Sequence, residues 1–187
     1  MKTVKFLSTT IFATALIFSC SSDDDSTPEP VLEEEVITTM TITLTADGQG
    51  DVILQTQDLD GDGPNEPEIT VSGDLASGTV YNGSILLENE TESPAENITL
   101  EVEEEDDEHQ FFYTVGSGLD ATVDYENFDA DGNPLGTAFR LTTGSSAGSG
   151  SLTFTLRHEP KKPNNGTLSD AGGETDISAS FNLTIAE

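Results

Sequence analysis

The sequence predicts an all-β protein, a β-sandwich of the immunoglobulin-like or jelly-roll kind with about eight to nine strands. Three observations predict it: short runs rich in β-branched residues, apolar–polar alternation within those runs, and clusters of Gly, Asp and Asn between them. Such alternation turns one face of each strand toward a core and the other toward water. One possible short helix interrupts the pattern.

The first strands follow directly after residue 35. In "VITTMTITLT", residues 36–45, the apolar residues Met40, Ile42 and Leu44 alternate with threonines. The turn "ADGQG" and the run "DVILQTQ" come next, which predicts a hairpin. We expect further strands at the following runs: "EITVSG", "TVYNGSILLENE", "QFFYTV", "ATVDYENF", "TAFRLTT", "SLTFTLRH" and "DISASFNLTIA".

The stretch from Pro94 to Glu108 is ambiguous between helix and strand. Residues 93–96, "SPAE", have the Ser, Pro and Glu of a capping box. Ile98 and Val102 lie four apart on one helical face, although Ile98, Leu100 and Val102 also alternate as in a strand. We expect a short helix over 94–108.

The N-terminal part of the chain differs in composition from the rest. Lys2 and Lys5 precede the apolar run "FLSTTIFATALIFS", and the single cysteine, Cys20, follows it. A basic segment before a short apolar run is typical of a secretory signal peptide, and the run is too short and polar for a membrane-spanning helix. We therefore expect three parts: a signal peptide at 1–19, a lipidated cysteine and acidic tether at 20–35, and one domain at 36–187.

The residues around Cys20 carry a resemblance. "ALIFSC" resembles the lipobox of bacterial lipoproteins, in which Cys20 would become the first residue and receive lipid, although Phe18 departs from the stricter form of that motif. Stable anchoring would follow from several acyl chains, at about 0.8 kcal/mol for each buried methylene. The next residues resemble the acidic signal that sends Bacteroidota lipoproteins to the cell surface: Ser21, Ser22, Asp23, Asp24 and Asp25. The resemblance implies a lipid anchor in the outer membrane, facing outward.

A wider layout, "QDLDGDG", "DEHQFFY" and "LRHEPKKP", is similar to that of a family of small Bacteroidota surface lipoproteins. That resemblance implies that the protein is an accessory lipoprotein of a TonB-dependent outer-membrane receptor, with a role in uptake or surface binding. It assigns no activity to particular residues.

The charge is strongly negative, with 36 acidic and six basic residues and a formal net charge of −30. Removal of residues 1–19 would take away two lysines and no acid. Nucleic acids and anionic lipid surfaces repel such a chain, so we expect no nucleic-acid partner. Cations, basic protein surfaces and neutral molecules are the compatible partners, and we expect a monomer.

Two histidines are the candidates for metal binding. His109 ends the acidic run "EVEEEDDEH", and His158 follows a predicted strand in "LRHEPKKP". On a helix Glu105 and His109 would share a face, as metal ligands often do. We expect zinc or a similar divalent ion to be held by His109, His158 and some of Glu105, Glu108 and Glu159. The alternative is a solvated acidic face with two unrelated surface histidines.

A weaker hypothesis concerns calcium. "DLDGDG" places Asp58, Asp60 and Asp62 at the first, third and fifth positions of a calcium loop. The glutamate required at position twelve is replaced by Ile69. A plain hairpin turn is the alternative, because Asp-Gly sequences favour turns.

The sequence indicates no catalytic motif. "GSSAG", residues 144–148, matches a nucleophile motif, but that motif needs a following helix and none is indicated here. We therefore expect a loop and a protein that is not an enzyme. The leading hypothesis is a lipid-anchored surface protein that captures a divalent cation for an outer-membrane transporter. The alternative is an acidic module that contacts a protein or glycan and binds no metal.

Overall fold

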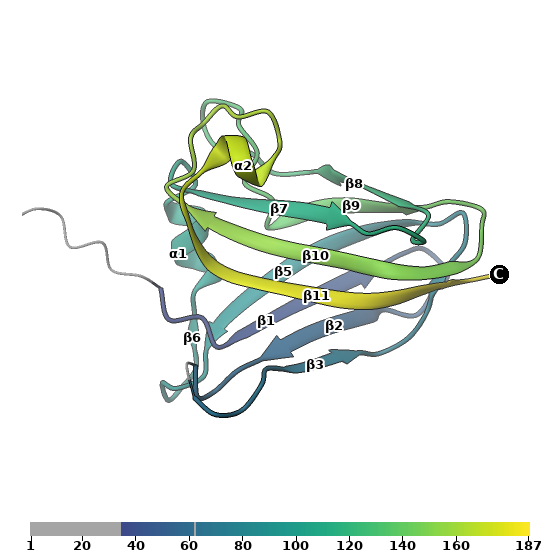
Figure 1. Ribbon diagram of the computed structural model, residues 1–187, viewed down its shortest axis with the longest axis horizontal. Coiled ribbons are helices and arrows are strands. Elements are labelled where there is room, and N and C mark those ends of the chain that lie inside the picture. The colour runs from purple at the N-terminus through teal and green to yellow at the C-terminus, as the bar shows by residue number, and fades with distance from the viewer. Residues whose placement is uncertain (1–34, 62) are drawn as a thin grey trace, which may run out of the picture. The chain divides into compact units, whose positions relative to one another are not determined.

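The computed structural model describes residues 35–61 and 63–187 (Figure 1). Five features named above lie outside these residues: the signal peptide, Cys20, the export residues 21–25, the tether up to residue 34, and Asp62. No helix within the described ranges is long and apolar enough to cross a membrane.

Two β-sheets lie face to face, and the all-β prediction is confirmed (Figure 1). The first sheet has the strand order β3-β2-β1-β5-β9-β8, with β6 paired to β5, and the second has the order β4-β11-β10-β7. The first sheet contains β1 (Thr39–Thr45), β2 (Val52–Gln57), β3 (Glu68–Val71), β5 (Val80–Asn89), β6 (Glu96–Asn97), β8 (Ala121–Tyr125) and β9 (Ala138–Thr143). The second contains β4 (Leu75–Ala76), β7 (His109–Val115), β10 (Gly148–His158) and β11 (Glu174–Ala186). The two-residue strands β4 and β6 were not expected from the sequence.

The core lies between the sheets, where the alternating apolar residues meet. Phe154 of β10 is fully buried, with its ring centroid 5.5 Å from that of Phe139 in β9 and 5.9 Å from that of Phe181 in β11. Phe139 belongs to the first sheet and Phe181 to the second, so Phe154 joins the two layers. Buried aromatic rings of this kind contribute most of the apolar area that stabilises a sandwich.

The helix predicted over 94–108 is much shorter, and the prediction was wrong at both ends. The helix α1 spans Thr99–Glu104. Before it, β6 pairs with β5, and the Asn97 side chain accepts a hydrogen bond of 3.0 Å from the backbone N–H of Thr99. After it come further acids and no basic residue, and negative charge is unfavourable at the C-terminal end of a helix. The chain therefore turns and enters β7.

The long loop between β10 and β11 contains the second helix, α2 (Leu168–Ala171). Lys162 fastens this loop to the rest of the protein: its ammonium lies 3.4 Å from the Asp129 carboxylate and donates to the backbone carbonyl of Asp106. Burial alone would raise the pKa of Asp129, but hydrogen bonds from Asn133 and the charge of Lys162 outweigh it and lower that pKa. Asp129 is thus an ionised anchor for the loop.

Candidate metal centre

His109 and His158 form one buried pair. His109 is the first residue of β7, His158 is the last of β10, and the antiparallel register places them directly opposite each other. Their rings stack with centroids 4.7 Å apart and planes inclined by 20°. The side chains are 0% and 10% exposed. The alternative of two unrelated surface histidines is therefore wrong.

Asp176 joins this pair through a β-bulge. Leu156 pairs with Ile177, but the next residue of β10, Arg157, pairs with Thr175, so Asp176 is the extra residue on β11. A bulge re-aims a side chain that plain alternation would send to the other face. The carboxylate of Asp176 is 3% exposed and lies 3.9 Å from Nδ1 of His158 and 4.0 Å from Nε2 of His109.

A glycine allows the start of β11 to approach the end of β10 closely. Gly173, just before β11, has φ 70°, and a Cβ there would lie 2.3 Å from the carbonyl oxygen of His158. A side chain at this position would push the start of β11 away from the end of β10. Gly173 thus keeps Asp176 near His158.

Glu35 completes the group from a different part of the chain. It precedes β1, and from the sequence it was expected to belong to the acidic tether. Its carboxylate is 4% exposed, with Oε1 3.1 Å from Nε2 of His109 and Oε2 3.8 Å from Nδ1 of His158. One ligand atom from each of Glu35, His109, His158 and Asp176 lies within 4.8 Å of the others. We call these four residues the His–acid cluster.

The protonation of His109 favours a cation in the cluster. Its Nδ1 lies 3.2 Å from the backbone carbonyl of Glu105. A carbonyl only accepts, so Nδ1 carries a proton, and in the neutral form of the ring the lone pair of Nε2 is directed toward the carboxylate of Glu35. This Nε2 is buried and has no hydrogen-bond partner among the residues that the structure describes. In that form Nε2 and the carboxylate are two facing acceptors, which a bound cation or a proton on Nε2 would hold together.

The donor set indicates which cation fits. Imidazole nitrogen and carboxylate oxygen are ordinary zinc ligands, whereas calcium and magnesium prefer oxygen alone. A tetrahedral zinc ion with bonds of about 2.0–2.1 Å places its ligand atoms roughly 3.3 Å apart. The four nitrogen–carboxylate distances in the cluster are 3.1 to 4.0 Å and involve both oxygens of each carboxylate, and one ligand atom from each residue lies within 4.8 Å of the others, so the side chains would have to move closer together around an ion.

The three acids predicted as ligands, Glu105, Glu108 and Glu159, lie outside the His–acid cluster. Glu105 contributes its backbone carbonyl and not its carboxylate, because α1 ends at Glu104 and the shared helical face does not exist. Glu108 is half exposed, with Oε2 4.0 Å from Nε2 of His158, where it would orient that ring from outside. Glu159 is exposed with φ 49° and does not belong to the cluster. The prediction that Glu105 and Glu159 are ligands was therefore wrong.

Two members of the cluster, Glu35 and Asp176, were missed from the sequence. Glu35 sits in a run of three glutamates without informative spacing. Asp176 precedes Ile177, whose inward alternation predicts that Asp176 faces water. The pair Gly172–Gly173 ahead of it was the one hint of irregular backbone.

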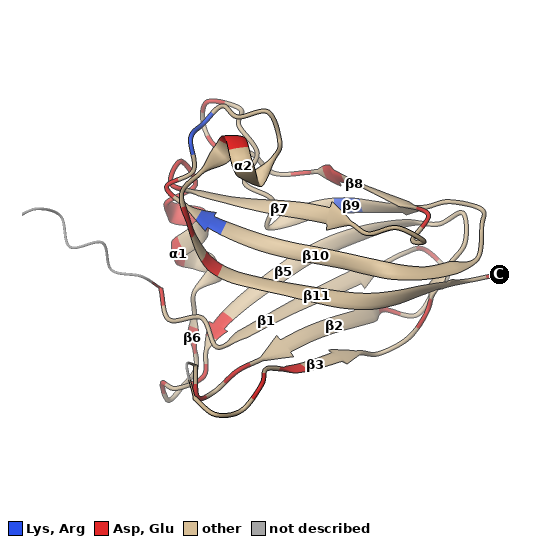
Figure 2. Cartoon of the chain, in the orientation of Figure 1, with Lys and Arg blue, Asp and Glu red and all other residues tan. Residues whose placement is uncertain are grey.

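Negative charge gathers around the cluster. Acidic residues crowd α1 and the turn after it, at the same end of the sheets as the cluster (Figure 2). The pKa of Glu101 is raised, first by desolvation and then by the charges of Glu35 and Glu105. Such a field attracts cations to this end of the protein.

The predicted calcium loop uses its carboxylates within a turn. Oδ1 of Asp58 accepts hydrogen bonds from the backbone N–H of Asp60 at 3.2 Å and of Gly61 at 2.9 Å. Oδ2 of Asp60 accepts from the side chain of Asn65 at 2.5 Å. These contacts suit the connection between β2 and β3, and calcium binding there stays a prediction.

Comparison with known proteins gives no second line of inference. No protein-family model, no curated protein and no solved structure matches this chain significantly. The functional assignment therefore depends on the geometry of the His–acid cluster.

Proposed function

We propose that this protein is a lipid-anchored binding protein of the outer-membrane surface that captures one zinc-like divalent cation in the His–acid cluster. The lipid anchor and location follow from the resemblance of the residues around Cys20 to a lipobox and export signal. Delivery of the ion to an outer-membrane transporter follows from the resemblance to lipoproteins that accompany TonB-dependent receptors.

One observation carries the proposal. Nε2 of His109 lies 3.1 Å from the Glu35 carboxylate, and the backbone carbonyl of Glu105, 3.2 Å from Nδ1, favours a proton on that opposite nitrogen. Metal-binding histidines have this arrangement, with the outer N–H held by a carbonyl or carboxylate. The Glu108 carboxylate lies 4.0 Å from Nε2 of His158, beyond hydrogen-bond distance, and would have to move closer to hold that ring in the same way.

The surroundings of the cluster suit capture of an ion from solution. The acidic residues of α1 and its following turn raise the local concentration of cations. His158 keeps 10% of its side chain exposed, and the neighbouring Glu108 is 53% exposed, so the ion would enter on this side. The two imidazoles then select zinc-like ions over calcium and magnesium.

A calorimetric titration tests the proposal. The protein, carrying Cys20→Ser so that no lipid is attached, is titrated with Zn²⁺ and in parallel with Ca²⁺. We expect one zinc per chain with micromolar or tighter affinity, and far weaker calcium binding. His109→Ala should weaken zinc binding by more than about 100-fold, because even outer partners of metal ligands cost about 10–100-fold.

A matched control separates the cluster from the general acidity. Glu159→Gln removes a carboxylate next to His158 in sequence but outside the cluster, and zinc affinity should stay within about twofold. Weak binding that is unchanged by His109→Ala would refute the proposal. The acidic interaction module would then become the leading hypothesis.

A further inference from the structure

Glu35 differs from the other three members of the His–acid cluster in its place in the fold. His109, His158 and Asp176 belong to β7, β10 and β11, which are neighbouring strands of the second sheet. Glu35 leads into β1, a strand of the first sheet. An ion held by all four residues would therefore connect the first sheet to the second at this end of the sandwich (Figure 1).

Within the described residues, no backbone hydrogen bond holds the segment from Glu35 to Ile37 in place. Among the described residues, the first of these bonds is at Thr38, whose N–H donates to the carbonyl of Glu88 at 3.0 Å. The carbonyl of Thr38 accepts from Asp58 at 2.7 Å. Ile37 packs partly against the core, whereas Val36 is 57% exposed. The contacts of Glu35 with the histidines are made by its carboxylate.

Without a cation, two carboxylates share one buried space. The side chains of Glu35 and Asp176 are 4% and 3% exposed, and their ligand atoms lie within 4.8 Å of each other. Like charges in such surroundings repel strongly. Asp176 is held by the pairing of β10 with β11, whereas Glu35 can turn away through rotation of residues 35–37. Glu35 is thus the ligand that would leave.

We propose that the bound ion acts as a latch, fastening the segment Glu35–Ile37 onto the second sheet and releasing it when the ion is lost. This inference rests on the proposed function, because it needs an ion in the His–acid cluster. Four protein ligands in a buried place are typical of zinc ions that hold structure together. The ion therefore determines how the first residues of the domain are seated.

Hydrogen exchange tests the latch directly. The protein carrying Cys20→Ser is compared with and without saturating Zn²⁺, and the exchange of the Thr38 amide is followed by mass spectrometry, because this amide donates the first backbone hydrogen bond among the described residues. We expect at least about tenfold slower exchange with zinc, because local opening governs the exchange of such a segment. Amides near the start of β5, which pairs with the end of β1 far from Glu35, should not change.

Two variants make the test specific, because each removes one carboxylate ligand from a different side. Glu35→Gln removes the ligand on the N-terminal segment, and Asp176→Asn removes a ligand on the second sheet. Each is measured at a zinc concentration that saturates it, as established by its own titration. The zinc-dependent protection of the Thr38 amide should disappear in Glu35→Gln and persist in Asp176→Asn.

The outcomes separate the latch from the proposed function. If zinc binds but does not slow the exchange of the Thr38 amide, or if zinc-loaded Glu35→Gln keeps that protection, the latch is overturned while the metal site stands. If zinc does not bind the protein with its cluster intact, both proposals fall. Glu35 precedes β1, so Glu35→Gln leaves strand pairing intact and is expected to fold.

Discussion

His109 and His158 face each other across β7 and β10, with stacked rings 4.7 Å apart and buried side chains. The pairing of the two strands sets this relationship, and the bulge at Asp176 adds a carboxylate to it. The second sheet thus supplies three of the four members of the His–acid cluster from a rigid frame. Rigid frames of this kind hold binding groups more accurately than loops do.

The position of Glu108 leads to a first prediction. Its carboxylate lies 4.0 Å from Nε2 of His158 and would orient that ring without touching the ion. Glu108→Gln should weaken zinc binding by about tenfold, the lower end for an outer partner. Calorimetry measures this, with Glu104→Gln as the control of equal charge change. Equal effects of the two substitutions would show that only the general charge matters.

The close approach at Gly173 leads to a second prediction. Gly172 and Gly173 both have positive φ, but only at Gly173 would a Cβ meet the chain, 2.3 Å from the carbonyl of His158. Gly172→Ala should cost about 1 kcal/mol of unfolding free energy from backbone strain, and Gly173→Ala about 3 kcal/mol. Denaturant unfolding checks both values.

The same glycine pair also reports on the metal centre. Gly173→Ala should lower zinc affinity because it separates Asp176 from His158, whereas Gly172→Ala should leave the affinity unchanged. A Gly173→Ala protein with full zinc affinity would contradict the role assigned to the bulge.

The buried ion pair of Lys162 and Asp129 gives a third prediction. Asp129→Asn leaves the ammonium of Lys162, which is 7% exposed, without its partner carboxylate. Removal of one partner from a buried pair costs about 3 kcal/mol or more of unfolding free energy. Urea unfolding at pH 7 measures the loss.

The pH dependence of this loss has a definite sign. The pKa of Asp129 is lowered in the folded protein, so the native state holds this carboxylate in its charged form. The contribution of this carboxylate to the free energy of unfolding is complete above its ordinary pKa of 3.8. It is lost as the pH falls through the lower pKa that the carboxylate has in the folded protein. The difference between the parent and Asp129→Asn should therefore be constant from pH 7 to pH 5 and shrink below 3.8. A difference that grew toward acid would contradict the assignment.

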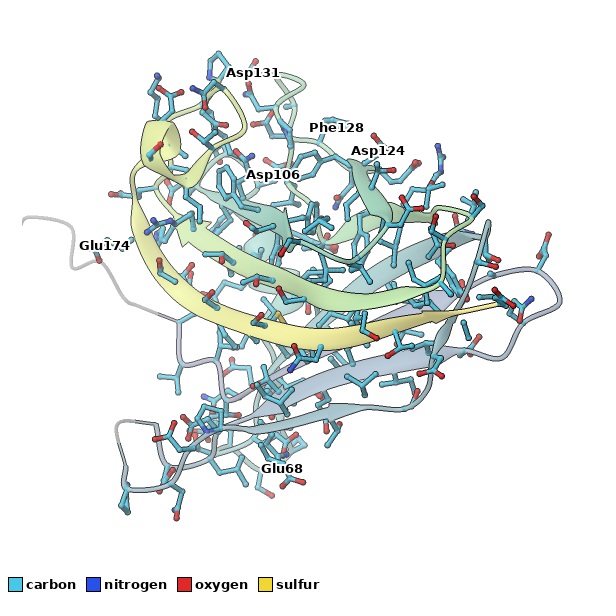
Figure 3. All side chains as sticks on the ribbon, turned by 45° about the vertical axis from the view of Figure 1, so that its right-hand side comes forward. Glu68, Asp106, Asp124, Phe128, Asp131 and Glu174 are labelled. Atoms are coloured by element: carbon cyan, nitrogen blue, oxygen red, sulfur yellow. The ribbon has the colours of Figure 1, made fainter. Side chains whose placement is uncertain are left out.

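The aromatic bridge between the sheets gives a fourth prediction. Phe154 is fully buried between Phe139 and Phe181, and its replacement by alanine should cost about 3–5 kcal/mol. Phe128, labelled in Figure 3, is 50% exposed, so Phe128→Ala should change stability by about 0.5 kcal/mol or less. Thermal unfolding of the two variants gives the comparison. Similar losses would mean that the core is not centred on Phe154.

The sequence by itself determined the all-β class. The alternation of Met40, Ile42 and Leu44 in β1, and of Leu152, Phe154 and Leu156 in β10, reports which face of each strand is buried, and that information is local. The prediction from local pattern was wrong for residues 94–108, where the sequence has a capping-box pattern but the structure pairs β6 with β5. Strand pairing formed there in place of the first turns of the helix, because an acidic helix that ends without basic residues has little stability of its own.

The candidate metal centre was only half accessible from the sequence. His109 and His158 stood out because the chain has no other histidine, and they were predicted as a pair. Their carboxylate partners could not be predicted, because Glu35 lies 74 and 123 residues before the two histidines and Asp176 depends on a bulge. Glu174, exposed at the start of β11 in Figure 3, is an equally acidic neighbour that the fold directs outward. Strand register and backbone irregularity decide such choices, and both arise only when distant segments pack together.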